Sequence, residues 1–115
     1  NCHELITASR HKIPVITVIF NNRTLGMVRQ WQELFFDKRY SQVSLEGADV
    51  NYAKLAEACG VQGFEVDDKN ELPKIIHNAI QLNAPVVIDV KIDAEENVMP
   101  MVPAGKPISE MLGID

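Results

Sequence analysis

The sequence predicts an α/β protein with an open parallel sheet and helices on both faces. Apolar, β-branched runs of strand length occur at residues 14–20, 61–66 and 85–92, and stretches with helical spacing lie between them. Because strands and helices alternate, each strand can join a parallel neighbour through a helical crossover. Three strands are few for such a sheet, so we expect the fold to be incomplete at the N-terminus.

Composition and charge favour one folded domain that binds neither nucleic acid nor a membrane. Hydrophobic residues make up 46% and charged residues 23% of the 115 residues, as in ordinary globular domains. The net charge is -5 and the basic residues are scattered, so the stripe that nucleic-acid binding needs is missing. The longest apolar run, 13–20, is too short to span a bilayer. Cys2 and Cys59 lack metal-binding spacing, and we expect reduced thiols in a cytoplasmic protein.

The first third of the chain is predicted to form a helix, a strand and a second helix. Residues 3–8 have helical character with no preceding cap, as if the chain were entered partway through an element. Residues 14–20 are apolar at nearly every position, which predicts a central strand buried on both faces. A polar turn at residues 21–26 follows. Apolar residues then return at helical spacing: Met27, Val28, Trp31, Leu34 and Phe35.

The middle of the chain is predicted to hold an irregular segment, a short helix and a second strand. Residues 37–48 mix polar side chains with Gly47 and favour an excursion without regular structure. Asp49 or Asn51 then caps a short helix, which Gly60 ends in a left-handed conformation. The strand at residues 61–66 comes directly after it.

The last third is predicted to form a helix, a third strand and an irregular tail. Asp68 and Glu71 have the spacing of a capping box, and Pro73 falls in the first turn of the helix that follows. The apolar face of this helix consists of Leu72, Ile75, Ile76, Ala79 and Ile80. Pro85 opens the third strand, and prolines in the tail exclude regular structure before residues 108–112.

The turn at residues 21–26 is the candidate site, because ligands in open α/β sheets bind where strands end and lead into helices. Asparagine side chains and backbone carbonyls are neutral oxygen ligands of the kind that Mg²⁺ accepts. Gly26 permits close approach of the backbone, and the N–H groups that open a helix at Met27 favour a phosphate. These features indicate a magnesium diphosphate site, although an Asn-Asn pair after a strand also fits an ordinary turn.

A resemblance to a known family extends this interpretation. The stretch VIFNNRTLGMVRQWQELFF, followed by RYS, resembles the second half of the thiamine diphosphate motif, which begins with Gly-Asp-Gly and ends with Asn-Asn. Within that family, GMVRQWQ with RYS is similar to the acetolactate synthase (acetohydroxyacid synthase) large catalytic subunits. NCHEL, KLAEACGVQGFEV, PVVIDVKI and MPMVPAG extend the similarity over essentially the whole chain. The resemblance implies the thiamine diphosphate-binding fold, with residues 1–94 as the C-terminal part of that domain and 95–115 as a C-terminal tail.

The same resemblance implies roles for five residues. Asn22 would ligate Mg²⁺ through its side chain, and Thr24 would do so through its backbone carbonyl. Gly26 and Met27 would contact the diphosphate of the cofactor. Met27 and Trp31 would line the substrate pocket, where Trp31 favours pyruvate or 2-ketobutyrate and would contact herbicides of this family. The resemblance assigns no catalytic residue to this chain.

For the intact enzyme, the resemblance implies condensation of pyruvate with a second 2-keto acid, pyruvate or 2-ketobutyrate, in branched-chain amino acid biosynthesis. The expected cofactors are thiamine diphosphate and magnesium, with FAD bound elsewhere in the intact enzyme and not by this segment. A cytoplasmic homodimer or tetramer, with a regulatory small subunit, is the expected assembly. The Gly-Asp-Gly half of the motif and the glutamate that activates the cofactor are absent from the sequence, so the chain alone is expected to be inactive. Arg29 and Gln30 match the family without an assigned role.

Two other functions stay open at this point. Another thiamine diphosphate enzyme, such as a pyruvate oxidase or a 2-keto acid decarboxylase, shares the Asn-Asn pair, although Trp31 argues against it. A non-catalytic α/β module that binds a partner or nucleotide needs no more than the fold. Met27, Trp31 and Phe35 recur every four residues, a pattern that also fits an ordinary core stripe.

Overall fold

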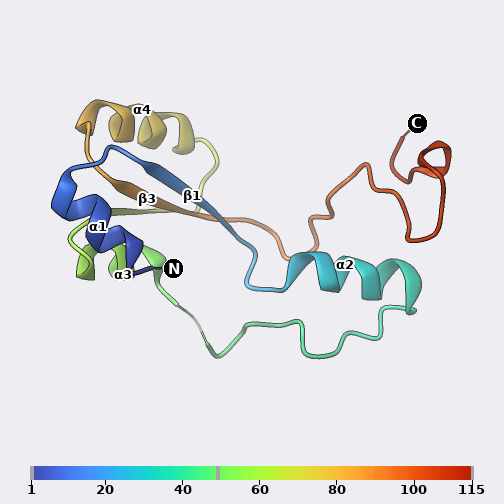
Figure 1. Cartoon of the computed structure of the whole chain (residues 1–115). Coiled ribbons are helices and arrows are strands. Elements are labelled where there is room, and N and C mark those ends of the chain that lie inside the picture. The colour runs from blue at the N-terminus through green and yellow to red at the C-terminus, as the bar shows by residue number, and fades with distance from the viewer. Residues whose placement is uncertain (1, 49, 115) are drawn as a thin grey trace. The chain divides into compact units, whose positions relative to one another are not determined.

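The computed structural model describes residues 2–48 and 50–114, so the predicted cap at Asp49 lies outside the described residues. Helices and strands alternate along the chain (Figure 1), as the sequence predicts, except that α3 follows α2 with no strand between them. The elements, in order, are α1 (Glu4–His11), β1 (Ile16–Asn21), α2 (Gly26–Phe35), α3 (Tyr52–Ala58), β2 (Gln62–Val66), α4 (Leu72–Leu82), β3 (Val86–Lys91) and the 3₁₀ turn η1 (Ile108–Glu110).

The three described strands form a parallel sheet in the order β1-β3-β2. This confirms the predicted open parallel sheet, but β3 is its central strand and β1 lies at an edge. The prediction that residues 14–20 form a central strand is therefore wrong for the described sheet, in which Phe20 is 70% exposed. An apolar run shows that a strand can be buried, whereas the crossovers decide which strand has two neighbours.

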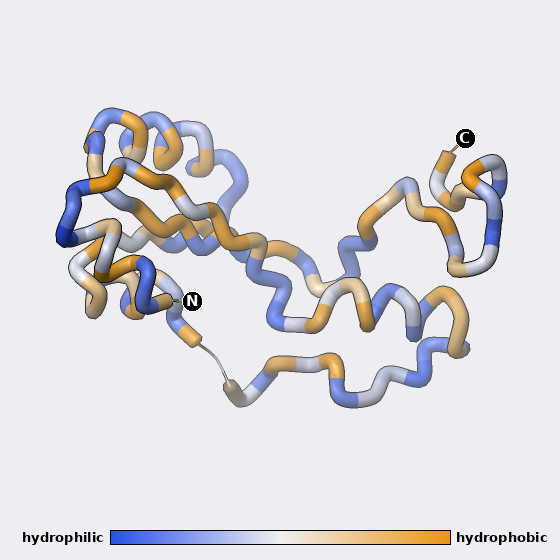
Figure 2. The backbone as a smooth tube through the Cα atoms, viewed as in Figure 1, coloured by the Kyte–Doolittle hydropathy of each residue, from blue (hydrophilic) through white to orange (hydrophobic). Residues whose placement is uncertain are grey.

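Helices cover both faces of the sheet, as predicted. Figure 1 shows α4 on one face, with α1 and α3 on the other. Successive side chains of β3 point to opposite faces, so that Ile88 packs with Ala79 of α4 and Val87 packs with Ala56 of α3. Hydrophobic stretches accordingly run through the strands in Figure 2, while the helices alternate between hydrophobic and hydrophilic residues.

The short helix α3 begins and ends with the residues that the sequence indicates. The side chain of Asn51 accepts a hydrogen bond of 2.8 Å from the backbone N–H of Lys54. Gly60 has a φ of 75°, a left-handed conformation that glycine adopts without steric cost. Local polar chemistry therefore sets both ends of this helix.

The start of α4 differs from the prediction. Glu71 itself occupies the N-cap position and makes no side-chain capping bond, so the predicted capping box is wrong. The reason is that Asp68 caps a turn of its own, in which its Oδ1 accepts a 2.9 Å hydrogen bond from the backbone N–H of Asn70. Pro73 lies in the first turn of α4, as predicted.

The chain divides into two compact units. The sheet unit consists of Asn1–Asn22 and Glu46–Ile92, and the α2 unit consists of Arg23–Leu45 and Asp93–Asp115. Both clusters of buried apolar residues belong to the sheet unit. In the described part of the α2 unit, only Arg29, Gln30 and Val43 are buried. The α2 unit therefore relies far less on apolar packing.

Substituting Gly63 by alanine tests how closely α3 approaches β2. A Cβ atom at Gly63 would lie 2.3 Å from the carbonyl oxygen of Ala53 and 2.7 Å from its Cα, so the backbone of α3 would have to shift. We expect Gly63→Ala to lower the free energy of unfolding by about 1–3 kcal/mol, measured by urea denaturation of the 115-residue chain. The neighbouring exposed variant Gln62→Ala should change it by less than about 0.5 kcal/mol. Similar values for both variants would mean that the contact relaxes without cost.

Candidate cofactor-binding loop

The end of β1 is anchored to β3 through Asn21. The Nδ2 atom of Asn21 donates a 3.3 Å hydrogen bond to Oδ2 of Asp89, and its carbonyl oxygen accepts a 3.2 Å bond from the N–H of Ile92. Asn22 follows directly and is half-buried. The sheet unit thus presents Asn22 at the carboxyl edge of its strands, where ligands of α/β proteins bind.

Asp89 is a buried carboxylate that sequence reasoning did not single out. It is 0% exposed in the central strand, and its Oδ2 atom also pairs with the ammonium group of Lys91. Its Oδ1 atom has no hydrogen-bond partner among the described residues. A charge buried in a sheet is costly unless it is paired, so an acidic residue inside the run PVVIDVKI was a signal that a partner had to exist.

Thr24, in the α2 unit, has its peptide groups oriented by a short antiparallel bridge with Ser44. The two main-chain hydrogen bonds of this bridge are made by residues on either side of Thr24, so its own carbonyl points away from Ser44. Its hydroxyl donates a 2.8 Å hydrogen bond to the carbonyl of Val43. The bridge therefore fixes the direction of the Thr24 carbonyl relative to Ser44.

The first turn of α2 offers backbone N–H groups. Leu25 precedes the helix without a side-chain capping bond, and its carbonyl accepts a 2.9 Å bond from the N–H of Arg29. Gly26 and Met27 are the first two helical residues, and N–H groups at such positions have no acceptor within the helix. The positive end of the helix dipole and these donors favour an anionic group such as a phosphate.

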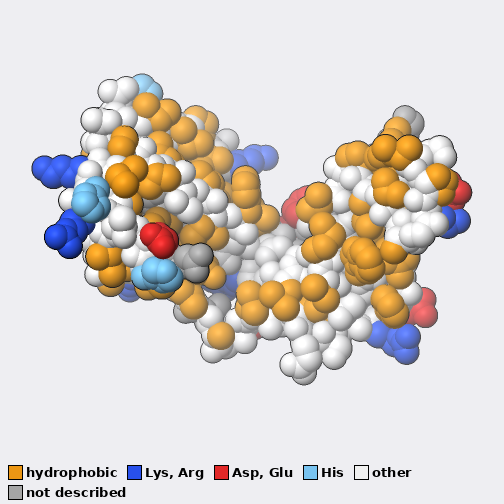
Figure 3. All heavy atoms as spheres, in the orientation of Figure 1, with side chains coloured by type: hydrophobic (Ala, Val, Ile, Leu, Met, Phe, Trp, Pro, Cys, Tyr) orange, Lys and Arg blue, Asp and Glu red, His pale blue; other side chains and the backbone are white. Residues whose placement is uncertain are grey.

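One side of α2 is apolar and exposed. Met27, Trp31 and Phe35 are 50%, 38% and 44% exposed, and the rings of Trp31 and Phe35 meet edge to face at 5.9 Å. Among the described residues of this chain, the stripe is therefore exposed and does not form part of a buried core. Figure 3 shows many hydrophobic side chains at the surface. An exposed apolar stripe of this kind can form the wall of a binding pocket.

The opposite side of α2 carries a buried polar cluster. Arg29 is 7% exposed and donates hydrogen bonds to Glu33 (3.0 Å) and Asn97 (3.3 Å), with its guanidinium 5.2 Å from the ring of Tyr40. Asn97 also donates a 3.1 Å bond to Glu33. This bond, together with the charges of Arg29 and Lys38, holds the pKa of Glu33 below its ordinary value, although partial burial opposes the shift.

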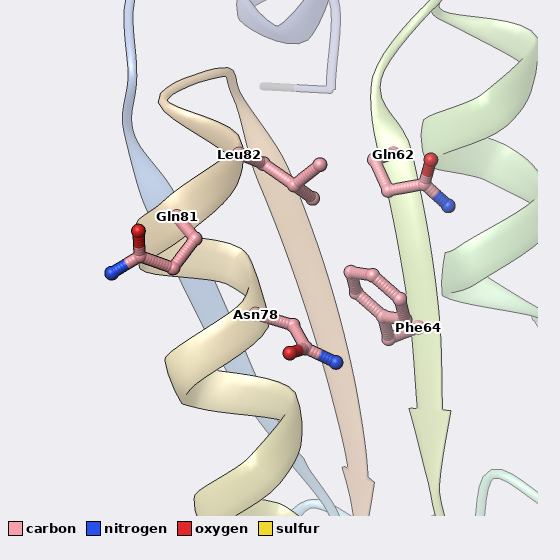
Figure 4. A pocket seen from close by; sticks show the side chains of 5 residues that line it. All are labelled: Gln62, Phe64, Asn78, Gln81 and Leu82. Carbon is pink, nitrogen blue, oxygen red and sulfur yellow. The ribbon is translucent and has the colours of Figure 1, made fainter.

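A pocket between β2 and α4 (Figure 4) lies at the end of the sheet opposite to Asn21. Gln62 begins β2 and is paired with Val86, the first residue of β3, so the pocket lies at the amino ends of the strands. Asn21 lies at the opposite, carboxyl end. The pocket is lined by Gln62, Phe64, Asn78, Gln81 and Leu82, of which Gln81 points away from it in Figure 4.

Within residues 2–48 and 50–114, no three or more His, Cys, Asp or Glu side chains gather as a metal site, and no helix is long and apolar enough to cross a membrane. The metal ligands that the resemblance implies, the amide of Asn22 and the carbonyl of Thr24, stay a prediction. They belong to different units of the chain. Each is therefore placed by its own neighbours: Asn22 by the end of β1, and Thr24 by the bridge to Ser44.

The family model described as "Thiamine pyrophosphate enzyme, C-terminal TPP binding domain" matches residues 1–90. The chain belongs to this family. Among solved structures, this thiamine pyrophosphate-binding domain is similar to the thiamine diphosphate-dependent 4-hydroxybenzoylformate decarboxylase of Rhodococcus jostii RHA1. The TM-score is 0.69 at 28% identity, and the match covers 77% of this chain and 16% of the decarboxylase. The predicted thiamine diphosphate-binding fold is confirmed.

Curated relatives with higher identity are acetolactate synthase large subunits. The domain is 40% identical over 114 residues to the large subunit of Porphyra purpurea, covering 99% of this chain and 19% of that protein. It is 39% identical over 112 residues to the isozyme 2 large subunit of Escherichia coli K12, covering 97% and 20%. The chain thus spans about a fifth of the length of these relatives. The expected resemblance to acetolactate synthase large subunits is confirmed.

Asp89→Asn tests whether the Asp89 carboxylate holds the end of β1 in place. The substitution keeps the shape of the side chain but removes the negative charge that faces Lys91 and accepts from Asn21. We expect the free energy of unfolding of the chain to fall by about 1–3 kcal/mol in urea. The exposed Asp67→Asn should leave it within about 0.5 kcal/mol of the parent chain. Equal effects of the two substitutions would show that Asp89 does not anchor β1.

The Glu33 cluster predicts a loss of stability in acid. Because the pKa of Glu33 is lowered, the stabilisation is complete above its ordinary value and is lost as the pH falls through the lowered one. The emission of Trp31, the single tryptophan of the chain, should therefore change as the 115-residue chain is acidified. Glu33→Gln should remove this transition, whereas the exposed Glu96→Gln should preserve it. A transition that persists in Glu33→Gln would assign it to another group.

Proposed function

We propose that this domain is part of an acetolactate synthase large subunit, which condenses pyruvate with a second 2-keto acid in branched-chain amino acid biosynthesis. The observation that carries the proposal is the similarity to such subunits, at 40% identity over 99% of the chain. The exposed stripe with Met27 and Trp31 supports it, because the substrates are small 2-keto acids with aliphatic ends. The match to a thiamine pyrophosphate-binding family over residues 1–90 argues against a non-catalytic module.

The residues of the loop fit a magnesium diphosphate group. The amide oxygen of Asn22 and the carbonyl of Thr24 are hard oxygen ligands that Mg²⁺ accepts. The bridge with Ser44 turns the Thr24 carbonyl away from Ser44, which supports the carbonyl as the ligand. The first-turn N–H groups of Gly26 and Met27 would hold the diphosphate. When bound, thiamine diphosphate supplies the carbanion chemistry, and the protein supplies binding and orientation.

Met27 and Trp31 would form one wall of the substrate pocket. Their apolar side chains would exclude water from the reacting centre and contact the alkyl group of the acceptor. An acceptor with one more buried methylene group, 2-ketobutyrate rather than pyruvate, gains about 0.8 kcal/mol from such a wall. The wall would therefore favour the larger acceptor by roughly fourfold.

The intact enzyme is proposed to be a cytoplasmic homodimer or tetramer that binds FAD outside this segment. The relatives are named large subunits, which supports a regulatory small subunit as a further partner.

A second candidate is a 2-keto acid decarboxylase, because the solved decarboxylase shares the fold at a TM-score of 0.69. A pyruvate oxidase would share the same cofactor chemistry. The lower identity of 28% to the decarboxylase makes this candidate the weaker one. The product formed from pyruvate distinguishes all three enzymes: acetolactate, acetaldehyde or acetate.

The full-length protein incubated with pyruvate, thiamine diphosphate, Mg²⁺ and FAD should form acetolactate, detected as acetoin after acid treatment. Asn22→Ala in the full-length protein should raise the Mg²⁺ concentration needed for half-maximal activity by at least about tenfold, whereas the exposed Asn78→Ala should not change it. The 115-residue chain alone should form no product. Acetaldehyde or acetate as the main product would replace the proposal with one of the alternatives.

A further inference from the structure

Two glutamines on either side of Trp31 make the same kind of contact with two different segments. The Oε1 atom of Gln30 accepts a 2.8 Å hydrogen bond from the N–H of Val98, and its Nε2 donates a 2.9 Å bond to the Val98 carbonyl. The Oε1 atom of Gln32 accepts a 2.9 Å bond from the N–H of Ser41, and its Nε2 donates a 3.1 Å bond to the Ser41 carbonyl. Each amide therefore pairs with both main-chain groups of one distant residue.

These contacts hold the main chain without depending on the side chains of the bound segments. Each glutamine amide takes the place that a neighbouring peptide group has in a sheet, with one bond donated and one accepted. Gln30 is 1% exposed, and its Nε2 also lies 3.1 Å from the sulfur of Met101. Losing a partner at such a buried site leaves polar groups unpaired, which is costly.

Apolar packing within the α2 unit contributes little to the orientation of its helix. The buried apolar clusters lie in the sheet unit, and Val43 is the one buried apolar residue among the described residues of the α2 unit. Leu25 also provides no side-chain cap at the start of α2. The rotation of α2 about its axis is therefore set mainly by polar contacts.

The two glutamines hold α2 from nearly opposite sides. Side chains advance by roughly 100° per residue around a helix, so Gln30 and Gln32 project about 200° apart. Met27 lies about 60° and Trp31 about 100° from Gln30, so both fall within the roughly 200° arc that separates Gln30 from Gln32. The apolar stripe thus lies between the two glutamine contacts, and a rotation that moved Trp31 would break both pairs of bonds.

We propose that Gln30 and Gln32 are positioning residues that lock α2 between the segments at Val98 and Ser41 and so fix how Met27 and Trp31 face the 2-keto acid. The statement that Met27 and Trp31 face a 2-keto acid rests on the proposed function. The lock, meaning the hold of the two glutamines on α2, does not depend on it. Neither glutamine touches the reacting atoms in this role. Their effect passes through the orientation of the helix.

The lock is tested in the full-length protein with Gln30→Met and Gln32→Met, which keep the length of the side chain but remove its amide. Hydrogen exchange should speed up roughly tenfold at the Val98 amide in the first variant and at the Ser41 amide in the second. Gln81→Met, the same change on the exposed surface of α4, should alter neither. Gln32 is only half-buried, so its variant stays informative if Gln30→Met fails to fold.

The positioning role needs a second readout. The ¹⁹F resonance of 5-fluorotryptophan at Trp31, assigned with Trp31→Phe, should shift or broaden in both glutamine variants and stay unchanged in Gln81→Met. The KM for the acceptor keto acid should rise several-fold, with a smaller change in kcat. Unchanged exchange at Val98 and Ser41 would overturn the lock. Faster exchange with an unchanged Trp31 resonance would overturn the positioning role. If the parent protein forms no acetolactate, the proposed function fails, and exchange with ¹⁹F spectra still decides whether the lock exists.

Discussion

The pairing of β3 between β1 and β2 is the constraint on which the rest of the structure depends. Because β3 has a neighbour on each side and helices on both faces, its side chains are buried along almost its whole length. Asp89 is consequently buried as well, and it holds Asn21 and Lys91 at the carboxyl end of the sheet. Asn22 owes its position at the start of the candidate loop to this central strand.

The two units of the chain are stabilised by different interactions: apolar burial in the sheet unit and polar contacts in the α2 unit. The sheet unit buries aliphatic side chains on both faces of the sheet, and each fully buried aliphatic side chain contributes about 1.5–3 kcal/mol. The α2 unit is held mainly by polar contacts, among which the neutral hydrogen bonds contribute only about 0.5–1.5 kcal/mol net each. Segments of low local stability are the ones that can change conformation when a ligand binds. The residues proposed to contact substrate lie in this second unit, and the strand that anchors the loop lies in the first.

The polar contacts of α2 involve one part of its surface and leave the apolar part exposed. Arg29 and Glu33 face Asn97, and the two glutamines bind the main chain of Val98 and Ser41. These contacts leave Met27, Trp31 and Phe35 exposed as a stripe. A ten-residue helix without an apolar core beneath it can thus present three large hydrophobic side chains in a defined direction.

The sequence by itself determined the order of the elements, the caps of α3, the parallel sheet and the loop at Asn22, because periodicity, glycine placement and capping residues act over a few neighbouring positions. It also identified the family, through motifs such as GMVRQWQ. Only the tertiary structure decided that β3 rather than β1 is central, and that Asp68 caps its own turn instead of α4. It also decided the partners of Asp89, Gln30 and Arg29. The most distant of these partners lie 68 residues away for Asp89 and Arg29 and 71 residues away for Gln30. Nothing in the local pattern states which distant group will meet a side chain.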